Sequence, residues 1–305
     1  MTEFCRRAFT ILPPAKGVGS LYEYMIGVGA MKAGTTLMYR QLLEHPQIRR
    51  GVRKSVDYFN ITQAPSKAQY DALFAPGEGP KMDISPFYMY YAPSIERIAA
   101  TLDPKRTAVV VLLRDPVERA FSHYRMRKSQ NMEDQPFEAT FELEASRTAR
   151  SYHDLQLFSY FTRGLYAQQL DRLYALFPKE NIRIYLFEEF IGHQQQWLDD
   201  LCGFLGIQCV PVQDMHENKT VVNVKSRALA RLVEKIARLV PKSMKRRWMG
   251  KLRRKVTAAN ERKDVKETID PAFARRLTEY YREEVLRLRD EYGVDISKWK
   301  HFANL

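Results

Sequence analysis

Residues 22–45 read YEYMIGVGAMKAGTTLMYRQLLEH, and this stretch decides the fold. Its first part, 22–29, predicts a strand, the small residues that follow predict a tight loop, and 35–45 predicts a helix that ends at His45–Pro46. A glycine-rich motif indicates a phosphate-binding loop when it lies between a strand and a helix, as it does here. We therefore expect the N–H groups at the start of this helix to face an anion.

The loop departs from the sequence that binds nucleoside triphosphates, G-x-x-x-x-G-K-[ST], in which the lysine follows the second glycine. Gly29 and Gly34 have the expected spacing, and Thr36 occupies the position of the magnesium-binding hydroxyl. However, Thr35 stands in the lysine's position and Lys32 lies inside the loop. The sequence therefore argues against Mg-ATP bound in the usual way. A tight turn with a solvated lysine is the alternative that needs no ligand.

Two further strands are predicted, at 107–113 (TAVVVLL) and at 181–187 (NIRIYLF). The first is apolar on both faces, as a central strand of a parallel sheet is. Strands that alternate with helices predict a three-layer α/β/α fold around a central parallel sheet. The helices are expected at 35–45, 116–130, 137–149, 164–177, 188–207, 226–240 and 272–291.

We expect a single domain over 1–305. Its core would span about 22–225, and a closing helix would follow at about 270–300. Residues 241–268, rich in charge and poor in core residues, are expected to form a basic insertion that could be flexible.

The stretch LLRDPVERAFSHY (112–124) predicts a second site for an anion. Arg114 follows the strand at 107–113, at the carboxyl edge where open α/β sheets bind ligands. Ser122 comes about two helical turns later and can face the same edge. A guanidinium and a hydroxyl suit a phosphate group, although an Arg114–Asp115 surface pair would need no ligand. An arginine where a magnesium-binding acid would stand also argues against metal-dependent phosphoryl transfer.

These two motifs resemble those of the sulfotransferases that use 3′-phosphoadenosine 5′-phosphosulfate (PAPS). The family's loop G-x-x-K-x-G-T-T matches 29–36, and its 3′-phosphate motif L-R-[DN]-P-x-x-R-A-x-S-x-Y matches 113–124. The resemblance spans about residues 22–300. Within the family, the sequence is similar to the bacterial and heparan-sulfate-type branch. Further matching stretches are LEHPQI (43–48), KSVDYF (54–59), DISPFY (83–88) and RGLYAQQLDRLYALFP (163–178).

The resemblance implies a P-loop-like sulfotransferase fold and in-line transfer of a sulfuryl group without a metal. Lys32 would neutralise the charge that develops on the leaving phosphate oxygen. A basic loop over the donor would draw on 216–227, although simple solvation of those cations is the alternative. The donor-binding residues implied in this way are Gly29, Ala30, Met31, Lys32, Ala33, Gly34, Thr35, Thr36, Arg114, Ser122, Lys219, Lys225 and Arg227.

The acceptor side departs from the family pattern. Relatives of the heparan-sulfate type carry their catalytic base as the glutamate of K-E-x-H-F-F, where this chain has Ser55. Three other side chains could take the acceptor's proton: Asp57, Asp83 and His123. Each also has a purely structural alternative. Asp57 could be a turn carboxylate, Asp83 a buried hydrogen-bonded acid, and His123 a residue on the surface of a helix.

The net charge of +13 is concentrated in 225–256, which contains 13 lysines and arginines against Glu234 alone. Apolar residues at helical spacing in 226–256 fit either a basic helix on an anionic membrane or a helix packed on the domain. No apolar run is long enough to span a membrane. With three scattered cysteines and no secretory leader, we expect a cytoplasmic protein, with peripheral attachment at the inner face of the membrane as an alternative.

The expected acceptor is a hydroxyl or amine of a glycan, a lipid or a lipid-linked glycan. Other functions stay open at this point. A P-loop kinase or phosphotransferase would show Mg-ATP dependence, and a non-catalytic relative would bind the nucleotide without transfer. Specific nucleic-acid binding has no recognition motif to support it.

Overall fold

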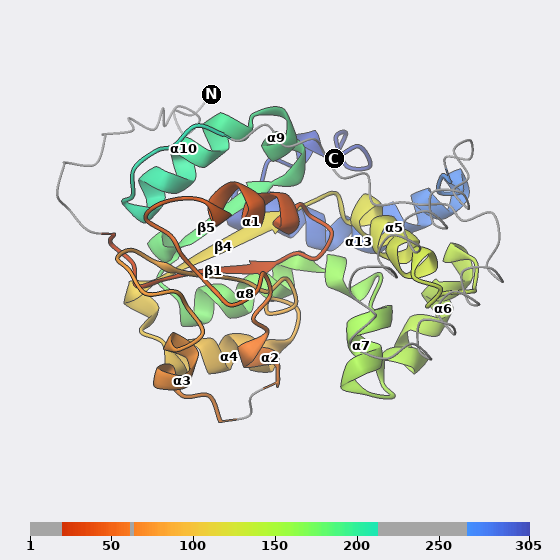
Figure 1. Ribbon diagram of the computed structural model, residues 1–305. Coiled ribbons are helices and arrows are strands. Elements are labelled where there is room, and N and C mark those ends of the chain that lie inside the picture. Colours follow the sequence, from red (N-terminus) through yellow and green to blue (C-terminus); the bar gives the residue numbers. More distant parts are fainter. Residues whose placement is uncertain (1–19, 62–63, 213–266) are drawn as a thin grey trace, which may run out of the picture. The chain divides into compact units, whose positions relative to one another are not determined.

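A computed structural model describes residues 20–61, 64–212 and 267–305 (Figure 1). These residues form two compact units. The first contains the described residues up to Arg119, those from Arg163 to 212, and Tyr280–Leu305, whereas the second contains Ala120–Thr162 and 267–279. The prediction of one domain over 1–305 stays a prediction. The predicted helix at 226–240 and residues 241–266 lie outside the described part of the chain.

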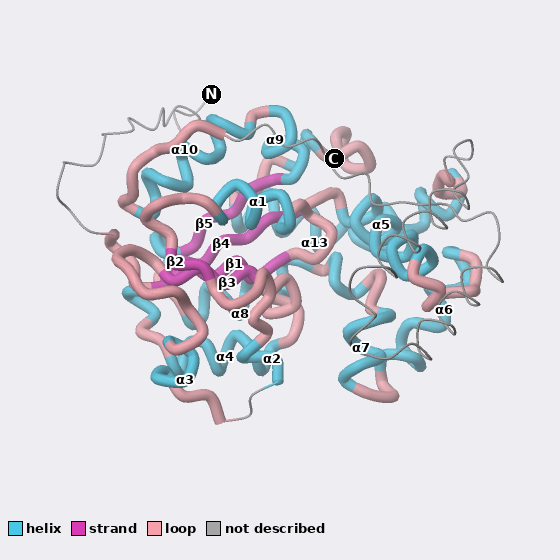
Figure 2. The backbone as a smooth tube through the Cα atoms, in the orientation of Figure 1, coloured by secondary structure: helices cyan, strands magenta, loops and turns pink. Residues whose placement is uncertain are grey.

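The first unit is built on a five-stranded sheet with the order β2-β3-β1-β4-β5, in which all pairs are parallel (Figure 2). The predicted strands at 22–29, 107–113 and 181–187 are confirmed as β1, β4 and β5. β2 and β3 were not predicted. The strands are β1 Tyr24–Gly29, β2 Arg49–Arg50, β3 Lys81–Ile84, β4 Thr107–Leu113 and β5 Ile182–Leu186.

Helices cover both faces of this sheet, which confirms the three-layer α/β/α prediction. In Figure 1, α1 (Thr35–Leu43), α9 (Phe187–Gly192) and α10 (Gln194–Leu205) lie on one face. On the other face lie α4 (Ala92–Thr101) and α8 (Tyr166–Leu176). The sheet is buried between these layers, and every residue of β1 and β4 is buried because parallel strands need cover on both sides.

Short elements complete the first unit. They are α2 Tyr58–Ile61, α3 Lys67–Asp71 and the 3₁₀ turns η1 Pro104–Arg106, η3 Lys179–Asn181 and η4 Ile296–Lys298. α5 (Pro116–Ser129), α13 (Pro271–Tyr292) and η2 (Thr162–Gly164) contribute residues to both units. None of the helices in the described residues is long and apolar enough to cross a membrane.

The second unit is helical and also contains α6 (Phe137–Thr148) and α7 (Tyr152–Phe158). Its core is aromatic, since the centre of the Phe137 ring lies within 5.5 Å of the centres of four others, those of Phe121, Tyr124, Phe161 and Phe273. A buried carboxylate, Glu144, accepts hydrogen bonds from the N–H groups of Phe161 and Thr162.

One predicted helix is wrong in detail. Residues 188–207 were expected to form a single amphipathic helix, but the chain breaks at His193, whose φ of −138° and ψ of 52° are not helical. The break separates α9 from α10. α9 directly follows β5, and its first residue, Phe187, lies beside the glycine loop.

Candidate functional site

The glycine loop, 29–36, connects the end of β1 to the start of α1. Gly29, with φ of 156°, turns the chain out of the strand, and the N–H of Ala30 donates to the Leu112 carbonyl of β4 at 2.6 Å. Lys32 and Gly34 have left-handed φ angles of 74° and 94°. The start of the loop is thus held against the carboxyl end of β4.

The N-terminus of α1 is open to an anion. Gly34 is its N-cap residue and provides no side-chain acceptor, and the first turn contains no acidic residue. The N–H groups of the first helical residues, Thr35 and Thr36, have no carbonyl partner within the helix. The positive end of the helix dipole is therefore left for a ligand, as in other phosphate-binding loops.

A second lysine reaches this loop from another segment. Lys54, which follows β2, donates from Nζ to Oγ1 of Thr36 at 2.6 Å. Burial first, and then the nearby cations Lys32 and Arg40, lower the pKa of Lys54 to about 8, while Asp57 acts in the opposite direction. The lysines that the sequence analysis assigned to donor binding are Lys32, Lys219 and Lys225, and Lys54 is not among them. The signal for Lys54 was present in the stretch KSVDYF but carried no assigned role.

Arg114 lies beside the loop, at the carboxyl end of β4. Its Nη1 donates to the Lys32 carbonyl at 3.3 Å, and its guanidinium carbon lies 4.6 Å from the centre of the Phe187 ring. Its Nε is buried without a hydrogen-bond partner among the described residues. The sheet therefore brings together Lys32 and Arg114, two cations that lie far apart in the sequence.

Ser122 and His123 belong to the second unit. The side chain of Ser122 is half-buried. His123 is buried, and its ring packs edge-on against Tyr160, with 4.8 Å between the ring centres. The donor-binding candidates Lys219, Lys225 and Arg227 lie outside the described residues.

Asp57 is half-buried in a left-handed turn with φ of 56°. Its Oδ1 accepts from Nδ2 of Asn60 at 2.9 Å, and its N–H donates to Oγ of Ser85 at 3.0 Å. Burial raises the pKa of Asp57, and the charge of Arg53 opposes that rise. The charge of this carboxylate also acts on Lys54, whose ammonium group donates to Thr36 of the loop.

Asp83 has a different environment, since it is fully buried in β3. Burial raises its pKa to about 6, against the effect of its hydrogen-bond donors. Ser55, which replaces the expected glutamate, donates to the Ile84 carbonyl at 3.1 Å. Asp83 and Ser55 therefore fasten 55–56 to β3. The donors to the Asp83 carboxylate are Oγ of Ser85 at 2.7 Å, the hydroxyls of Tyr88 and Tyr70 at 2.8 and 3.1 Å, and the N–H of Val56 at 3.4 Å.

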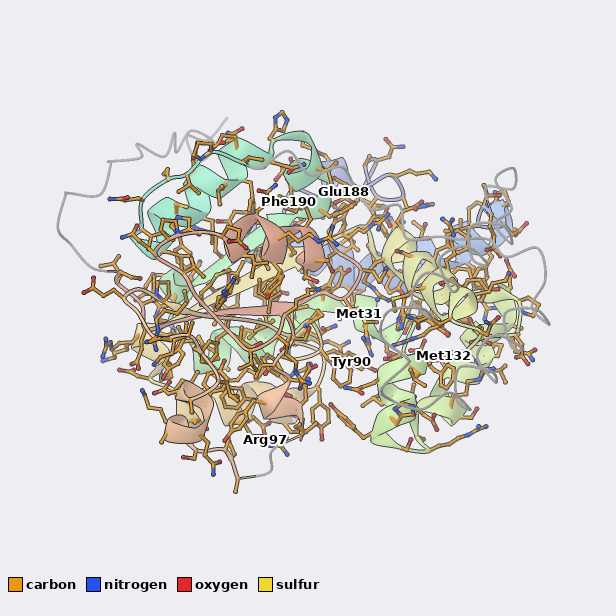
Figure 3. All side chains as sticks on the ribbon, in the orientation of Figure 1. Met31, Tyr90, Arg97, Met132, Glu188 and Phe190 are labelled. Atoms are coloured by element: carbon orange, nitrogen blue, oxygen red, sulfur yellow. The ribbon has the colours of Figure 1, made fainter. Side chains whose placement is uncertain are left out.

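Two buried arginines support the loop and were missed from the sequence. Arg119 donates from Nη1 to the Met31 carbonyl at 3.5 Å, and Arg163 from Nη1 to Sδ of Met31 at 3.2 Å. The Arg163 guanidinium lies 4.5 Å from the ring centre of Phe87 and 5.2 Å from that of Tyr90; Met31 and Tyr90 are labelled in Figure 3. Arg119 is the second arginine of the 3′-phosphate motif and Arg163 begins the stretch at 163–178, so the signal was present in the sequence but carried no assigned role.

An open pocket of about 470 Å³ lies beside the exposed side of α1. Thr36 and Arg40 are exposed on that helix, one turn apart, and Tyr39 and Leu43 continue the same face towards the pocket. The lining of the pocket contains two aromatic residues and one arginine. The lining residues are Tyr39, Leu43, Arg50, Gly51, Val52, Phe74 and Ala75.

The donor set suits a ligand with separated phosphate groups. Lys32, Lys54, the N-terminus of α1 and Arg114 are all cations or hydrogen-bond donors, and they lie at the carboxyl ends of the neighbouring strands β1 and β4 or close by. Within the described part of the chain, no group of three or more His, Cys, Asp or Glu side chains is arranged to hold a metal ion.

Comparison with known proteins identifies the class. The family model described as "Sulfotransferase domain" matches residues 25–289, so the chain belongs to the sulfotransferase family. A sulfotransferase from Alicyclobacillus acidocaldarius superposes with a TM-score of 0.67 at 25% identity, over 90% of this chain and 98% of that one.

Two curated relatives are similar over part of their length. The membrane-associated sulfotransferase kil1 of Dictyostelium discoideum is 32% identical over 136 residues, which cover 42% of this chain and 28% of that protein. Human heparan sulfate glucosamine 3-O-sulfotransferase 3B1 is 28% identical over 196 residues, which cover 62% of this chain and 47% of that protein. The chain thus spans less than half the length of these two relatives.

Proposed function

We propose that the chain transfers a sulfuryl group from PAPS to a hydroxyl or amine of an acceptor, with a glycan as the favoured acceptor class. The observation that carries this proposal is the pairing of Lys32 and Arg114 at the ends of two neighbouring central strands. A donor with phosphate groups at its 5′ and 3′ positions needs two such anion sites, whereas ATP needs one continuous site for a triphosphate. Membership of the sulfotransferase family supports the same donor.

The loop would hold the 5′ end of the donor. The N–H groups at the start of α1 face its phosphate, and the hydroxyls of Thr35 and Thr36 add donors there. Arg114 would bind the 3′-phosphate bidentately, with its plane fixed by stacking on Phe187. The hydroxyl of Ser122 is proposed to assist at the 3′-phosphate.

Transfer would proceed in line. The bound donor supplies the sulfuryl group, whose bond to the 5′-phosphate oxygen breaks as a new bond forms from sulfur to the acceptor oxygen or nitrogen. Lys32 stabilises the negative charge that grows on the leaving phosphate oxygen. The carboxylate of Asp57 takes the acceptor's proton, and a pKa raised by burial makes it a better proton acceptor than an exposed aspartate.

We favour Asp57 over the other candidates because of its access. Asp57 is half-buried close to the cationic loop, whereas the Asp83 carboxylate is fully buried and engaged by four donors. Asp83 would then act indirectly, by fastening the segment that carries Asp57 to β3 through the N–H of Val56. His123 remains a second candidate.

Two observations support a glycan as the acceptor. A human relative is named as a heparan sulfate glucosamine 3-O-sulfotransferase. The pocket beside α1 also combines Tyr39, whose ring can stack on a sugar, with Arg50, which can bind an anionic group. Arg50→Ala should raise the KM for an anionic glycan while leaving the KM for PAPS unchanged.

The donor is tested first by calorimetric titration with 3′-phosphoadenosine 5′-phosphate, alongside Mg-ATP in the same salt. Tight binding of the bisphosphate without metal, and much weaker binding of ATP, would support the two-site proposal. The reverse preference would replace it with a P-loop phosphotransferase. Bisphosphate binding without sulfation of any glycan or lipid acceptor from ³⁵S-labelled PAPS would instead indicate a non-catalytic relative.

A further inference from the structure

The hydroxyl of Thr36 already has a cationic partner in the protein. In loops that bind nucleoside triphosphates, the serine or threonine at this position places its oxygen on Mg²⁺. Here Oγ1 of Thr36 accepts a hydrogen bond from Nζ of Lys54 at 2.6 Å, so an ammonium group lies where that metal would be expected. Lys54 comes from the segment after β2, and the contact therefore depends on the fold.

The charges around Lys54 explain what such an arrangement can do. Lys32 from the loop and Arg40 from α1 act on it as like charges, and Asp57 from its own segment is the acid that opposes them. The first turn of α1 contributes no carboxylate. Positive charges that act on one another in this way favour the binding of an anion beside them.

We propose that Lys54 serves as a protein-borne replacement for the magnesium ion of a phosphate-binding loop, neutralising the 5′ end of the sulfuryl donor and orienting the hydroxyl of Thr36 towards it. This inference rests on the proposed function, because it concerns the same donor. It makes Lys54 a positioning residue for binding, distinct from Lys32, which acts on the leaving oxygen.

The chemistry of a hydroxyl supports this role. A threonine hydroxyl has one proton to donate and two lone pairs. When Oγ1 of Thr36 accepts from an ammonium, its own proton is left for another acceptor, and the ammonium polarises the hydroxyl into a stronger donor. A phosphate oxygen above the start of α1 is the acceptor that this geometry favours. A second cation such as Mg²⁺ would be repelled by Lys54 and would lose the oxygen it needs.

The test measures the dissociation constant of 3′-phosphoadenosine 5′-phosphate by calorimetry at pH 7 and pH 9, for the wild type, Lys54→Met and Lys54→Arg. Lys54→Met removes the charge at similar length and should weaken binding about 10- to 100-fold at pH 7. The control is Lys105→Met, which removes an exposed lysine at the opposite end of β4 and should change nothing.

The pH dependence separates this role from a purely structural one. Since the pKa of Lys54 is lowered to about 8 in the nucleotide-free protein, its deprotonation should weaken the affinity of the wild type about tenfold between pH 7 and pH 9. Arginine stays charged over this range. Lys54→Arg should therefore keep most of the affinity at pH 7, and its affinity should not decrease between pH 7 and pH 9. Magnesium should not tighten binding to the wild type.

A double-mutant cycle tests whether Lys54 acts through Thr36. In a Thr36→Val background, Lys54→Met should cost clearly less than in the wild type, because the hydroxyl it orients is gone. Wild-type affinity in Lys54→Met, or an unchanged pH 7–9 fall in Lys54→Arg, would overturn the inference. Failure of the wild type to bind the bisphosphate would instead remove the proposed function, so the two failures are distinguishable.

Discussion

Gly34 lies against the ring of Phe187: a Cβ atom at position 34 would be only 2.8 Å from Cδ2 of that ring. The contact joins the glycine loop to the first residue of α9. It also explains why the loop ends in glycine, because φ at this position is 94°, where other residues are strained. The stacking of Arg114 on the same ring extends the contact to the second cation.

Gly34→Ala should therefore destabilise the protein and weaken nucleotide binding. The left-handed backbone alone costs about 1–2 kcal/mol for a residue with a Cβ, and the clash with Phe187 adds to it. Chemical denaturation gives the change in free energy of unfolding. The matched control is Gly203→Ala in α10, where a Cβ would meet nothing within 4 Å and helix propensity should add about 0.5–1 kcal/mol of stability. Equal effects of the two substitutions would contradict the role given to Gly34.

Lys32→Ala should abolish most of the sulfuryl transfer without unfolding the protein. Loss of one preorganised group that stabilises a developing negative charge typically lowers the rate by about 10²- to 10³-fold. The measurement is kcat with ³⁵S-labelled PAPS, together with a thermal unfolding midpoint. Near-normal turnover in this variant would count against the proposed function.

Arg114→Ala should remove selectivity for the 3′-phosphate. The affinity for 3′-phosphoadenosine 5′-phosphate should fall about 10- to 100-fold, since a charged bidentate contact is lost. The affinity for adenosine 5′-phosphate, which has no 3′-phosphate, provides the control and should change little. A similar loss for both nucleotides would mean that Arg114 supports the loop through the Lys32 carbonyl rather than reading the ligand.

Asp57→Asn should lower kcat while leaving the affinity for the bisphosphate close to that of the wild type. A base must be ionised to accept a proton, so wild-type kcat should rise with pH through the pKa of Asp57, which burial places above that of an exposed aspartate. The variant should lose that rising limb, and the loss in rate is expected to be about 10²- to 10⁴-fold. Wild-type turnover in both Asp57→Asn and Asp83→Asn would exclude both carboxylates.

Asp83 should make stability depend on pH between about 4 and 6. Its folded-state pKa of about 6 lies above the value near 4 of an unfolded aspartate, so the folded state keeps a proton that the unfolded chain has already lost. The free energy of unfolding should therefore fall as pH rises through this window, by about 3 kcal/mol from this group. Asp83→Asn should lack the fall, whereas Asp134→Asn, at an exposed position, should retain it.

Long apolar strands and glycine motifs could be predicted from the sequence, because they depend on local patterns. β4 and the loop at 29–36 are of this kind. β3 could not be predicted in this way, because in its sequence KMDI two charged residues, which normally face solvent, alternate with two apolar ones. Lys81 and Asp83 are nevertheless buried, the lysine paired with Glu23 and Asp71 and the aspartate satisfied by hydroxyl groups. Burial of these charged side chains depends on how their partners are placed in the fold, which the alternation of polar and apolar residues does not reveal.

The same limit applies to the candidate site. Lys32 and Arg114 stand at recognisable positions in their motifs, and the sequence suggested that both would reach one edge of the sheet. The contact between Lys54 and Thr36 depends on how the short strand β2 directs the following residues, and two residues are too few for a pattern. The contact of Phe187 with the loop joins residues 34 and 187, and no local pattern in the sequence indicates a contact over that separation.

The central place of β1 has a consequence for synthesis on the ribosome. Tyr24 pairs with Lys81 on one side and with Thr107 on the other, and Ala30 is held by the Leu112 carbonyl. A nascent chain that has emerged only as far as residue 60 therefore contains the whole glycine loop but none of the strands that shape it. Competence to capture the nucleotide would arise only once β4, which ends at Leu113, has also been released. Ligand added to refolding chains should accordingly raise the yield of folded protein without speeding the earliest steps.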